Sequence, residues 1–294
     1  MEEQAQRKAA RPSTPRQRVE PSVQFNGEAA AEPIRAPLPA FPEIVSAAKS
    51  WREKFEEIVF GRDLSLLASH PLVALEKDSA AAEQYRILRE QVRTLRHETG
   101  ARSISVTSPL KHDGKTMVAV NLAVAMALGG QERVLLIDGD LRDPDVHKFF
   151  GVPRYPGLAD YLSSDYTGNL SSYVRPTSIP GLQIITAGKT SELAGELLAQ
   201  QRMKSLMEKI NSTYPDCQVI IDSSPVLATS DPLVLAREVG GVIMVVRAGK
   251  TRREYLKKAV DILNSPKLMG IVLNGAEFGM ATQHYQYLSL EPES

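Results

Sequence analysis

Residues 103–123 read SISVTSPLKHDGKTMVAVNLA, and the fold is inferred from this stretch. SISVT has the β-branched, apolar character of a buried strand. From Thr116 onward the apolar spacing changes to that of a helix, with an inward side formed by Val118, Leu122 and Ala125. The Gly-Lys-Thr of residues 114–116 therefore falls at a strand-to-helix turn. Free backbone N–H groups and the helix dipole favour phosphate at such a turn.

This candidate phosphate loop departs from the usual pattern, G-x-x-x-x-G-K-[ST]. Pro109 stands in place of the first glycine. In a working loop, Lys115 would reach the β- and γ-phosphates of a nucleotide and Thr116 would hold Mg²⁺. Taken alone, the degenerate motif leaves two interpretations open, a nucleotide site and three residues that only resemble one.

Beyond Gly100, short apolar runs alternate with helical patterns. Most of the runs are nearly continuous in apolar residues, as expected for strands covered on both faces. They occupy residues 103–107, 133–138, 182–187, 218–222, 241–246 and 269–274. Helices fit between most of these runs, at residues 116–129, 195–211 and 252–264. The alternation predicts an α/β fold with a mostly parallel sheet flanked by helices on both sides.

Three aspartates stand at the ends of two predicted strands. Asp138 and Asp140 belong to LLIDGDLRDP, and Asp222 belongs to VIIDSSP. Ligands of an open α/β sheet collect beyond the carboxyl ends of its strands, so these side chains are expected to converge on the loop. Carboxylates buried at this density need a cation, which Mg²⁺ with a nucleotide would supply. One such Asp is more often a cap or turn residue, but three in these places favour a nucleotide site.

Composition limits the other classes of protein to which the chain could belong. The chain has 294 residues, of which 43% are hydrophobic and 24% charged, enough for a full core. A formal charge of zero gives no argument for a nucleic-acid partner. Cys217 is the only cysteine, which excludes an internal disulfide. No apolar run approaches the roughly 18 residues of a transmembrane helix and no secretory signal is visible, so an intracellular protein without a transmembrane segment is expected.

The chain divides into four segments by composition. Residues 1–42 carry seven of the 19 prolines and few large apolar side chains, which predicts a disordered arm. Residues 43–78 are predicted to form an amphipathic helix, which contains the only tryptophan, Trp51, and a linker. Residues 79–278 carry the predicted strands and form the P-loop domain. Residues 279–294 are predicted to be a flexible tail.

GKT, LLIDGDLRDP and VIIDSSP together resemble the Walker A, A′ and B motifs of a known family. These are the bacterial tyrosine kinases (BY-kinases) of the capsular exopolysaccharide group, which includes the CpsD and CapB proteins. The resemblance runs from about residue 75 to 278. A helix predicted to begin after Ser79 adds a further match, because its E-x-x-R-x-x-R pattern resembles the family's oligomerisation motif, here formed by Glu83, Arg86 and Arg89.

The resemblance implies a protein-tyrosine autokinase that uses ATP and Mg²⁺ and regulates capsular or exopolysaccharide synthesis or export. It implies that Asn274 contacts adenine and that the loop contacts to the nucleotide come from Asp113, Gly114, Lys115, Thr116 and Met117. Thr116, Asp140 and Asp222 would hold the metal, and Asp138 would take the proton of the attacking tyrosine hydroxyl. This division of roles between metal ligands and a proton acceptor suits phosphoryl transfer, which mainly requires charge neutralisation and an aligned nucleophile.

Partners are implied in the same way. The family resemblance implies a homo-oligomer, ring-like in form, and a transmembrane polysaccharide chain-length regulator, or co-polymerase, whose cytoplasmic tail completes the active site. The chain would then be cytoplasmic and peripheral at the inner face of the plasma membrane. The implied phosphoacceptors are the two tail tyrosines, Tyr285 and Tyr287.

Two departures from the family pattern leave alternatives open. Lys111-His112-Asp113 replaces the usual Pro-Gly-Glu before Gly-Lys, and a positive φ at His112 would cost about 1 kcal/mol, although histidine is enriched among residues that tolerate it. The loop is expected to function, with Lys111 able to add a phosphate contact. The tail is poor in tyrosine. A MinD/ParA-like ATPase and a kinase-inactive ATP-binding regulatory subunit remain alternatives, and Leu110, where MinD/ParA proteins have a second Lys, counts against the first.

Overall fold

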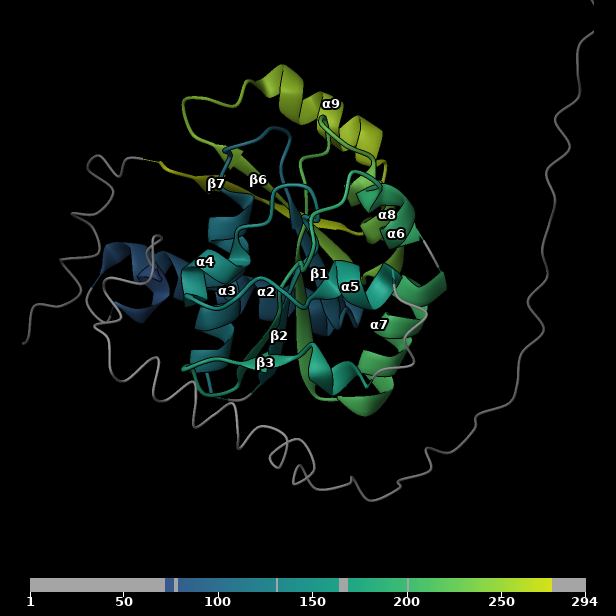
Figure 1. Cartoon of the computed structure of the whole chain (residues 1–294). Coiled ribbons are helices and arrows are strands. Elements are labelled where there is room, and N and C mark those ends of the chain that lie inside the picture. Colours follow the sequence, from purple (N-terminus) through teal and green to yellow (C-terminus); the bar gives the residue numbers. More distant parts are fainter. Residues whose placement is uncertain (1–71, 77–78, 131, 164–168, 200, 277–294) are drawn as a thin grey trace, which may run out of the picture. The chain divides into compact units, whose positions relative to one another are not determined.

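The computed structural model describes residues 72–76, 79–130, 132–163, 169–199 and 201–276 (Figure 1). The predicted arm, the predicted helix around Trp51 and the tail with Tyr285 and Tyr287 lie outside these ranges. Among the described helices, no stretch combines the length and the hydropathy that a bilayer-spanning segment needs.

A seven-stranded sheet forms the centre of the described domain, in the order β3-β4-β2-β5-β1-β6-β7. Every neighbouring pair is parallel except β3 and β4. The predicted mostly parallel sheet is therefore confirmed. The strands are β1 (Ser103–Thr107), β2 (Arg133–Asp138), β3 (Arg175–Pro176), β4 (Leu182–Ile185), β5 (Cys217–Asp222), β6 (Gly241–Arg247) and β7 (Leu268–Asn274).

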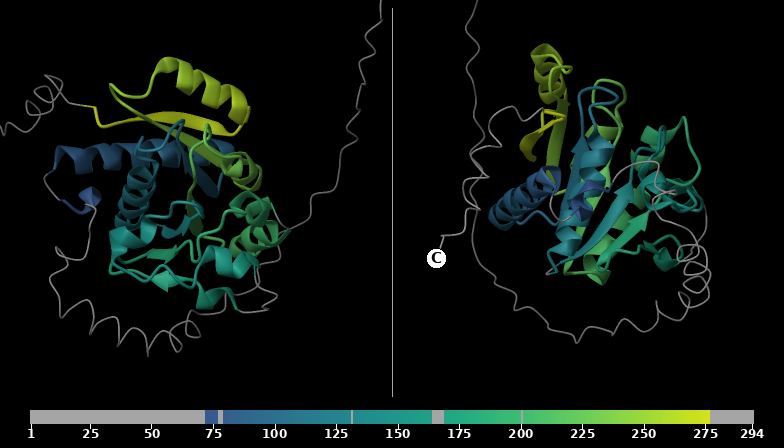
Figure 2. Two further views of the ribbon diagram at one scale, coloured as in Figure 1. Left: turned by 45° about the horizontal axis from the view of Figure 1, so that its top comes forward. Right: turned by 90° about the vertical axis from the view of Figure 1, so that its left-hand side faces the viewer.

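Helices cover both faces of the sheet (Figure 2). One buried apolar cluster joins the sheet to α2 (Ala80–Thr99), α3 (Lys115–Leu128) and α4 (Val146–Phe150). A second cluster joins the opposite face to α5 (Leu158–Ser163), α6 (Ala194–Ala199), α7 (Gln201–Thr213), α8 (Asp231–Glu238) and α9 (Arg253–Leu263). Two short 3₁₀ helices, η2 (Val73–Leu75) and η3 (Leu170–Ser172), complete the described elements. The helix predicted at 195–211 corresponds to two segments, α6 and α7.

α3, which follows the phosphate loop, is buried on every side rather than only on the predicted inward one. All residues from Val118 to Ala127 are buried, and only Leu128, at its last position, is half exposed. A helix that is apolar all round belongs in the interior, and here α2 covers the side of α3 that faces away from the sheet. The phosphate loop is thus attached to one of the least exposed elements of the domain.

α2 begins where the sequence predicts, because the Ser79 hydroxyl accepts a hydrogen bond from the Ala81 N–H. It ends at Gly100, whose backbone is left-handed. Ala82 and Val92 are buried, whereas Ala81 is exposed. Val92 belongs to the same buried apolar cluster as α3, so this side of α2 faces the interior.

β7 does not have the cover on both faces that was expected for most of the predicted strands. It pairs only with β6 and forms one edge of the sheet. Ile271 is 50% exposed and Leu273 is 61% exposed. An apolar run therefore did not distinguish an edge strand from a central one, since both types are rich in branched apolar residues.

Candidate active site

The phosphate loop connects β1 to α3 and has two residues with left-handed backbone. His112 has φ 66° and Gly114, the residue before the first turn of α3, has φ 95°. The positive φ expected at His112 is confirmed. Gly114 cannot be replaced by a larger residue without a clash, because a Cβ there would come 1.9 Å from the Asn274 Nδ2 atom. The loop keeps the shape that exposes backbone N–H groups at the start of a helix, where an anion is favoured.

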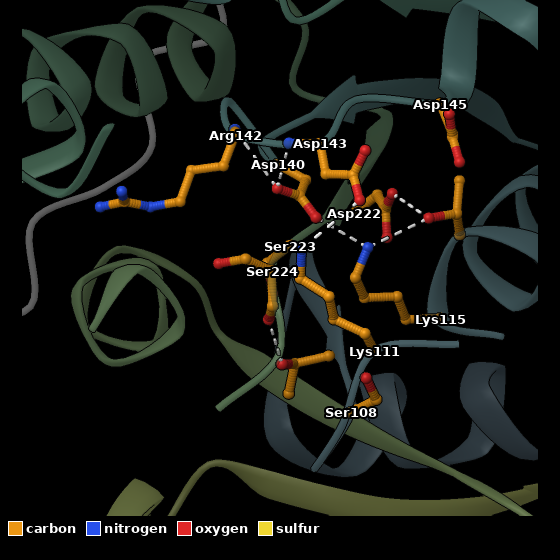
Figure 3. Close-up of polar contacts among 12 residues, drawn as sticks. Ser108, Lys111, Lys115, Asp140, Arg142, Asp143, Asp145, Asp222, Ser223 and Ser224 are labelled. Atoms are coloured by element: carbon orange, nitrogen blue, oxygen red, sulfur yellow. Dashed lines mark hydrogen bonds and ion pairs between the residues drawn. The ribbon is translucent and has the colours of Figure 1, made fainter. Parts of the chain in front are cut away.

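Lys115 points at the carboxylate of Asp140 (Figure 3), and Thr116 also contacts a carboxylate. The Lys115 Nζ atom lies 2.8 Å from the Asp140 Oδ2 atom, and both side chains are largely buried. The Thr116 hydroxyl donates to the Asp222 Oδ2 atom at 2.7 Å. These pairs connect the loop to the ends of β2 and β5, as the convergence of strand ends predicted.

Asp138 and Asp222 face each other at the ends of neighbouring strands, where they are partners in the β2–β5 register. Both are fully buried. The Asp138 Oδ2 atom accepts a hydrogen bond from the Val146 N–H at 3.2 Å. One oxygen of each carboxylate, Oδ1, has no hydrogen-bond partner among the described residues. Such orphaned buried oxygens are unfavourable unless a proton or a cation meets them.

The electrostatics of the site follow from this crowding. Burial raises the pKa of Asp138 well above its ordinary value, and the nearby carboxylates of Asp222 and Asp140 raise it further. Burial also raises the pKa of Asp222 to about 6, although the Lys115 ammonium opposes the shift. Burial would lower the pKa of Lys115, but the carboxylates of Asp222 and Asp140 outweigh this effect and raise it. One ammonium therefore lies beside three carboxyl groups, whose mutual repulsion can be relieved by a proton or by a divalent cation.

The remaining predicted nucleotide residues are distributed around the loop. Lys115, Thr116 and Met117 line a pocket of about 490 Å³, together with Asp140 and other loop residues. Asp113 is buried beneath the loop, where its Oδ2 atom accepts a hydrogen bond from the Leu110 N–H at 2.9 Å. Asn274, at the end of β7, donates from Nδ2 to the Asp113 carbonyl at 3.0 Å. Its predicted contact with adenine stays a prediction.

The pocket wall does not contain all the predicted acids. Asp140 lines it, but Asp138 and Asp222 are not among its lining residues. Within the described ranges, no group of three or more His, Cys, Asp or Glu side chains is arranged to hold a metal ion by itself. The donor set that is present, the Thr116 hydroxyl with carboxylates of Asp140 and Asp222, fits a Mg²⁺ ion that takes its other ligands from phosphate and water.

An ion pair that sequence reasoning missed lies beside the pocket. The Arg142 guanidinium contacts the fully buried Asp231 carboxylate, with Nε 2.9 Å from Oδ2 and Nη2 3.4 Å from Oδ1. The Asp140 Oδ1 atom accepts from the backbone N–H of Asp143 at 3.1 Å, within the same loop. This loop, which carries Asp140, is thereby fixed to the start of α8. Arg142 and Asp231 are 89 positions apart in the sequence, so no local pattern indicates their contact.

The predicted oligomerisation residues lie on α2. Glu83 and Arg86 form an ion pair on the exposed side of the helix. Arg89 is more buried, and its Nη1 atom donates to the Ala125 carbonyl in the last turn of α3 at 3.2 Å. Arg89 therefore has a contact within its own domain, and the role of the motif in assembly stays a prediction.

The other sequence expectations are simpler to place. Lys111 is exposed, and its Nζ atom lies 3.7 Å from the Asp143 Oδ2 atom at the rim of the pocket. Cys217 is the first residue of β5 and is buried, so it is a core residue. Tyr285 and Tyr287 fall outside the described residues.

Comparisons with known proteins agree with this geometry. No protein-family model matches the chain. It is 31% identical over 225 residues to tyrosine-protein kinase YwqD of Bacillus subtilis, a match that covers 76% of this chain and 93% of that protein. It is also 31% identical over 220 residues to tyrosine-protein kinase etk of Escherichia coli, covering 74% of this chain and 30% of etk. The chain therefore spans most of YwqD but less than a third of longer relatives such as etk.

A solved structure gives the same result at the level of the fold. The kinase domain of the Escherichia coli tyrosine kinase ETK superposes with a TM-score of 0.66 at 30% identity, covering 72% of this chain and 83% of that domain. An identity of 31% that extends over 93% of YwqD goes beyond a shared fold. With a phosphate loop, two strand-end acidic motifs and this sheet order in place, the chain belongs to the family of bacterial tyrosine kinases.

Proposed function

We propose that the chain is a protein-tyrosine kinase that uses ATP and Mg²⁺ and phosphorylates tyrosine side chains, including its own. The observation that carries the proposal is the contact of Lys115 and Thr116, at the start of α3, with Asp140 and Asp222 at the ends of β2 and β5. The names of the relatives, which are tyrosine-protein kinases, support the same activity.

The chain's own residues would bind the nucleotide as follows. Lys115 and the N–H groups at the start of α3 hold the phosphates by charge and hydrogen bonds. Thr116, Asp140 and Asp222 hold Mg²⁺, two of them already in contact with each other. When bound, ATP and Mg²⁺ supply the phosphoryl group and the cation that neutralises its charge. Met117 and other residues of the wall shape the pocket around them.

Asp138 is the proposed proton acceptor for the tyrosine hydroxyl. Its position at the end of β2 and its unpartnered Oδ1 atom support this role, because a general base needs a free oxygen within hydrogen-bond reach of the proton that it accepts. Its full burial means that the loop after β2, held to Asp138 by the Val146 N–H, has to open before a hydroxyl can reach it.

The biological setting is proposed from the family. The chain acts in capsular or exopolysaccharide synthesis or export, together with a transmembrane chain-length regulator. It assembles with copies of itself through Glu83, Arg86 and Arg89 of α2, and it works in the cytoplasm at the inner face of the plasma membrane. Tyr285 and Tyr287 are its proposed acceptors.

The test is direct. Purified protein is incubated with ATP and Mg²⁺, with and without the cytoplasmic tail of the chain-length regulator, and phosphotyrosine is detected by antibody and mass spectrometry. Phosphotyrosine that forms in the wild type but not in Lys115→Met supports the proposal. ATP binding without any phosphotyrosine, even with the tail present, would instead identify a kinase-inactive regulatory subunit.

A further inference from the structure

The turn formed by His112, Asp113 and Gly114 is held from the side by residues of β6, β7 and the loop that precedes α9. Two of its three residues have left-handed backbone, and one of these, His112, is not glycine. A side chain makes this conformation unfavourable. Such a turn persists only where its surroundings fix it, so the contacts around it identify what keeps the phosphate loop in shape.

Asp113 is the centre of these contacts. Although it lies in an exposed turn, its side chain is buried. Its Oδ1 atom accepts a hydrogen bond from the Thr251 hydroxyl at 2.6 Å, and its Oδ2 atom accepts one from the Leu110 N–H at 2.9 Å. Its backbone carbonyl accepts the Asn274 Nδ2 bond at 3.0 Å. Hydrogen bonds therefore fix both the side chain and the backbone carbonyl of Asp113.

The partner residues are themselves connected. The Thr251 hydroxyl that donates to Asp113 also accepts a hydrogen bond from the Arg247 N–H at 2.9 Å. The Arg247 Nη1 atom in turn donates to the His112 carbonyl at 3.1 Å. These hydrogen bonds form a closed network. It leads from Arg247, at the end of β6, through Thr251 to Asp113 in the turn, and from His112 in the same turn back to Arg247. Hydrogen bonds to an ionised carboxylate are among the stronger ones in proteins.

We infer that Thr251 is a positioning residue for nucleotide binding, which acts through Asp113 to hold His112 and Gly114 in the shape that binds phosphate. Thr251 does not line the pocket, so it has no direct contact to offer a ligand there. It belongs to the loop that immediately precedes α9, so the position of this loop sets the shape of the phosphate loop. The inference rests on the proposed function of the loop as a nucleotide site.

Asn274 gains a second role from the same arrangement. Its amide is placed so close to Gly114 that a Cβ on that residue would overlap it. The side chain expected to contact adenine therefore also supports the turn. A substitution of Asn274 would change both roles at once, whereas Thr251 isolates the supporting role.

The experiment compares Thr251→Val with Thr251→Ser. Valine keeps the shape of threonine and removes the hydroxyl, and serine keeps the hydroxyl. Affinity for a fluorescent ADP analogue with Mg²⁺ is measured on the full chain, with the circular dichroism and thermal unfolding of each protein. We expect Thr251→Ser to bind like the wild type and Thr251→Val to bind roughly tenfold more weakly while still folded, as for the loss of one hydrogen bond to a charged group.

The third variant combines Thr251→Val with His112→Gly. Glycine accepts the left-handed backbone without support, so this double variant should recover most of the lost affinity. Thr251→Ala replaces Thr251→Val if the valine protein does not fold. Wild-type binding in Thr251→Val, or no recovery in the double variant, overturns the inference alone. A wild type that binds no nucleotide overturns the proposed function and this inference together.

Discussion

The ammonium of Lys115 lies 2.8 Å from the carboxylate of Asp140, and the two side chains come from the start of α3 and from the segment after β2, which meet only in the folded chain. Both are largely buried, so neither charge is well solvated. Both residues line the pocket, where the phosphates of a bound nucleotide would compete with Asp140 for the Lys115 ammonium.

Lys115→Met is expected to abolish measurable ATP binding, a loss of roughly a hundredfold or more, because it removes a charge-assisted phosphate contact. The fold should persist, since the acids can take up protons when their cation is gone. Isothermal titration calorimetry checks the affinity. Lys258→Met is the matched control, because this lysine is exposed on α9 and does not line the pocket, so the affinity should stay that of the wild type.

Asp138→Asn is expected to lower the rate of tyrosine phosphorylation far more than it lowers nucleotide affinity. A base acts only in the transition state, so its loss reduces turnover while ground-state binding changes little. General-base catalysis typically contributes about 10²- to 10⁴-fold, which is the size of effect expected in single-turnover assays. Asp140→Asn serves as the contrast, because loss of a metal ligand should weaken both. Equal losses of rate and affinity in Asp138→Asn would show that it is a ligand rather than a base.

Without metal, the free energy of unfolding of the wild type is expected to fall, relative to that of the Asp222→Asn variant, as the pH rises from about 4 to about 7. The pKa of Asp222 is raised to about 6 by burial, whereas an unfolded aspartate has a pKa of about 3.9. Between these values the folded protein binds more protons than the unfolded chain. The stabilising contribution of the neutral carboxyl is therefore complete below pH of about 4 and is lost as the pH passes the folded pKa.

Asparagine has no such titration, so the difference in unfolding free energy should grow in favour of the variant by on the order of 2–3 kcal/mol. Urea unfolding in the presence of EDTA at several pH values measures it. A difference that stays constant with pH would mean that Asp222 is ionised in the folded protein throughout.

Arg86→Ala combined with Arg89→Ala is expected to convert an oligomer into smaller species, as judged by light scattering with nucleotide present. The two arginines are not equivalent, because Arg89 also bonds to the Ala125 carbonyl. Its removal should cost about 1 kcal/mol of stability by itself, so Arg86→Ala alone is the cleaner probe. Arg93→Ala, on the same helix but outside the motif, should keep the mass of the wild type. A wild type that is monomeric at every concentration rules out the assembly role.

Replacing Tyr285 and Tyr287 together by Phe is expected to remove most of the phosphotyrosine that the protein places on itself. Tyr155→Phe is the control, since this side chain is 65% exposed within the folded domain and offers another accessible hydroxyl. Mass spectrometry of the peptides identifies the acceptors. Phosphotyrosine that persists in the double variant and disappears in Tyr155→Phe would move the acceptor from the tail to the domain.

Much of the fold was predictable because its signals are local. The bounds of β1 and β2 match the predicted runs residue for residue, since a strand buried on both faces differs sharply from the polar turns beside it. The left-handed turn at His112 was also predictable, because the spacing of the loop requires it whatever residue stands there. β3 was not predicted, since two residues with a proline carry too little pattern.

The hydrogen bonds that hold the site residues in place were less predictable, because they join residues that are far apart in the sequence. The Thr251–Asp113 and Asn274–Asp113 contacts join residues 138 and 161 positions apart. The Arg142–Asp231 pair spans 89 positions. A single sequence identifies a residue that could bind phosphate or metal by its type and local position. It carries no local signal for which distant side chain will hold that residue in place.

The fully buried helix α3 has a mechanical consequence. Its first residue is Lys115, and ten residues later the Ala125 carbonyl receives Arg89 of the helix that carries the predicted assembly motif. At the rise of an α-helix this separation is about 15 Å. The Arg89 contact therefore lies only about three helical turns from the phosphate loop. A displacement of α2 would reach the loop through this single, largely buried helix.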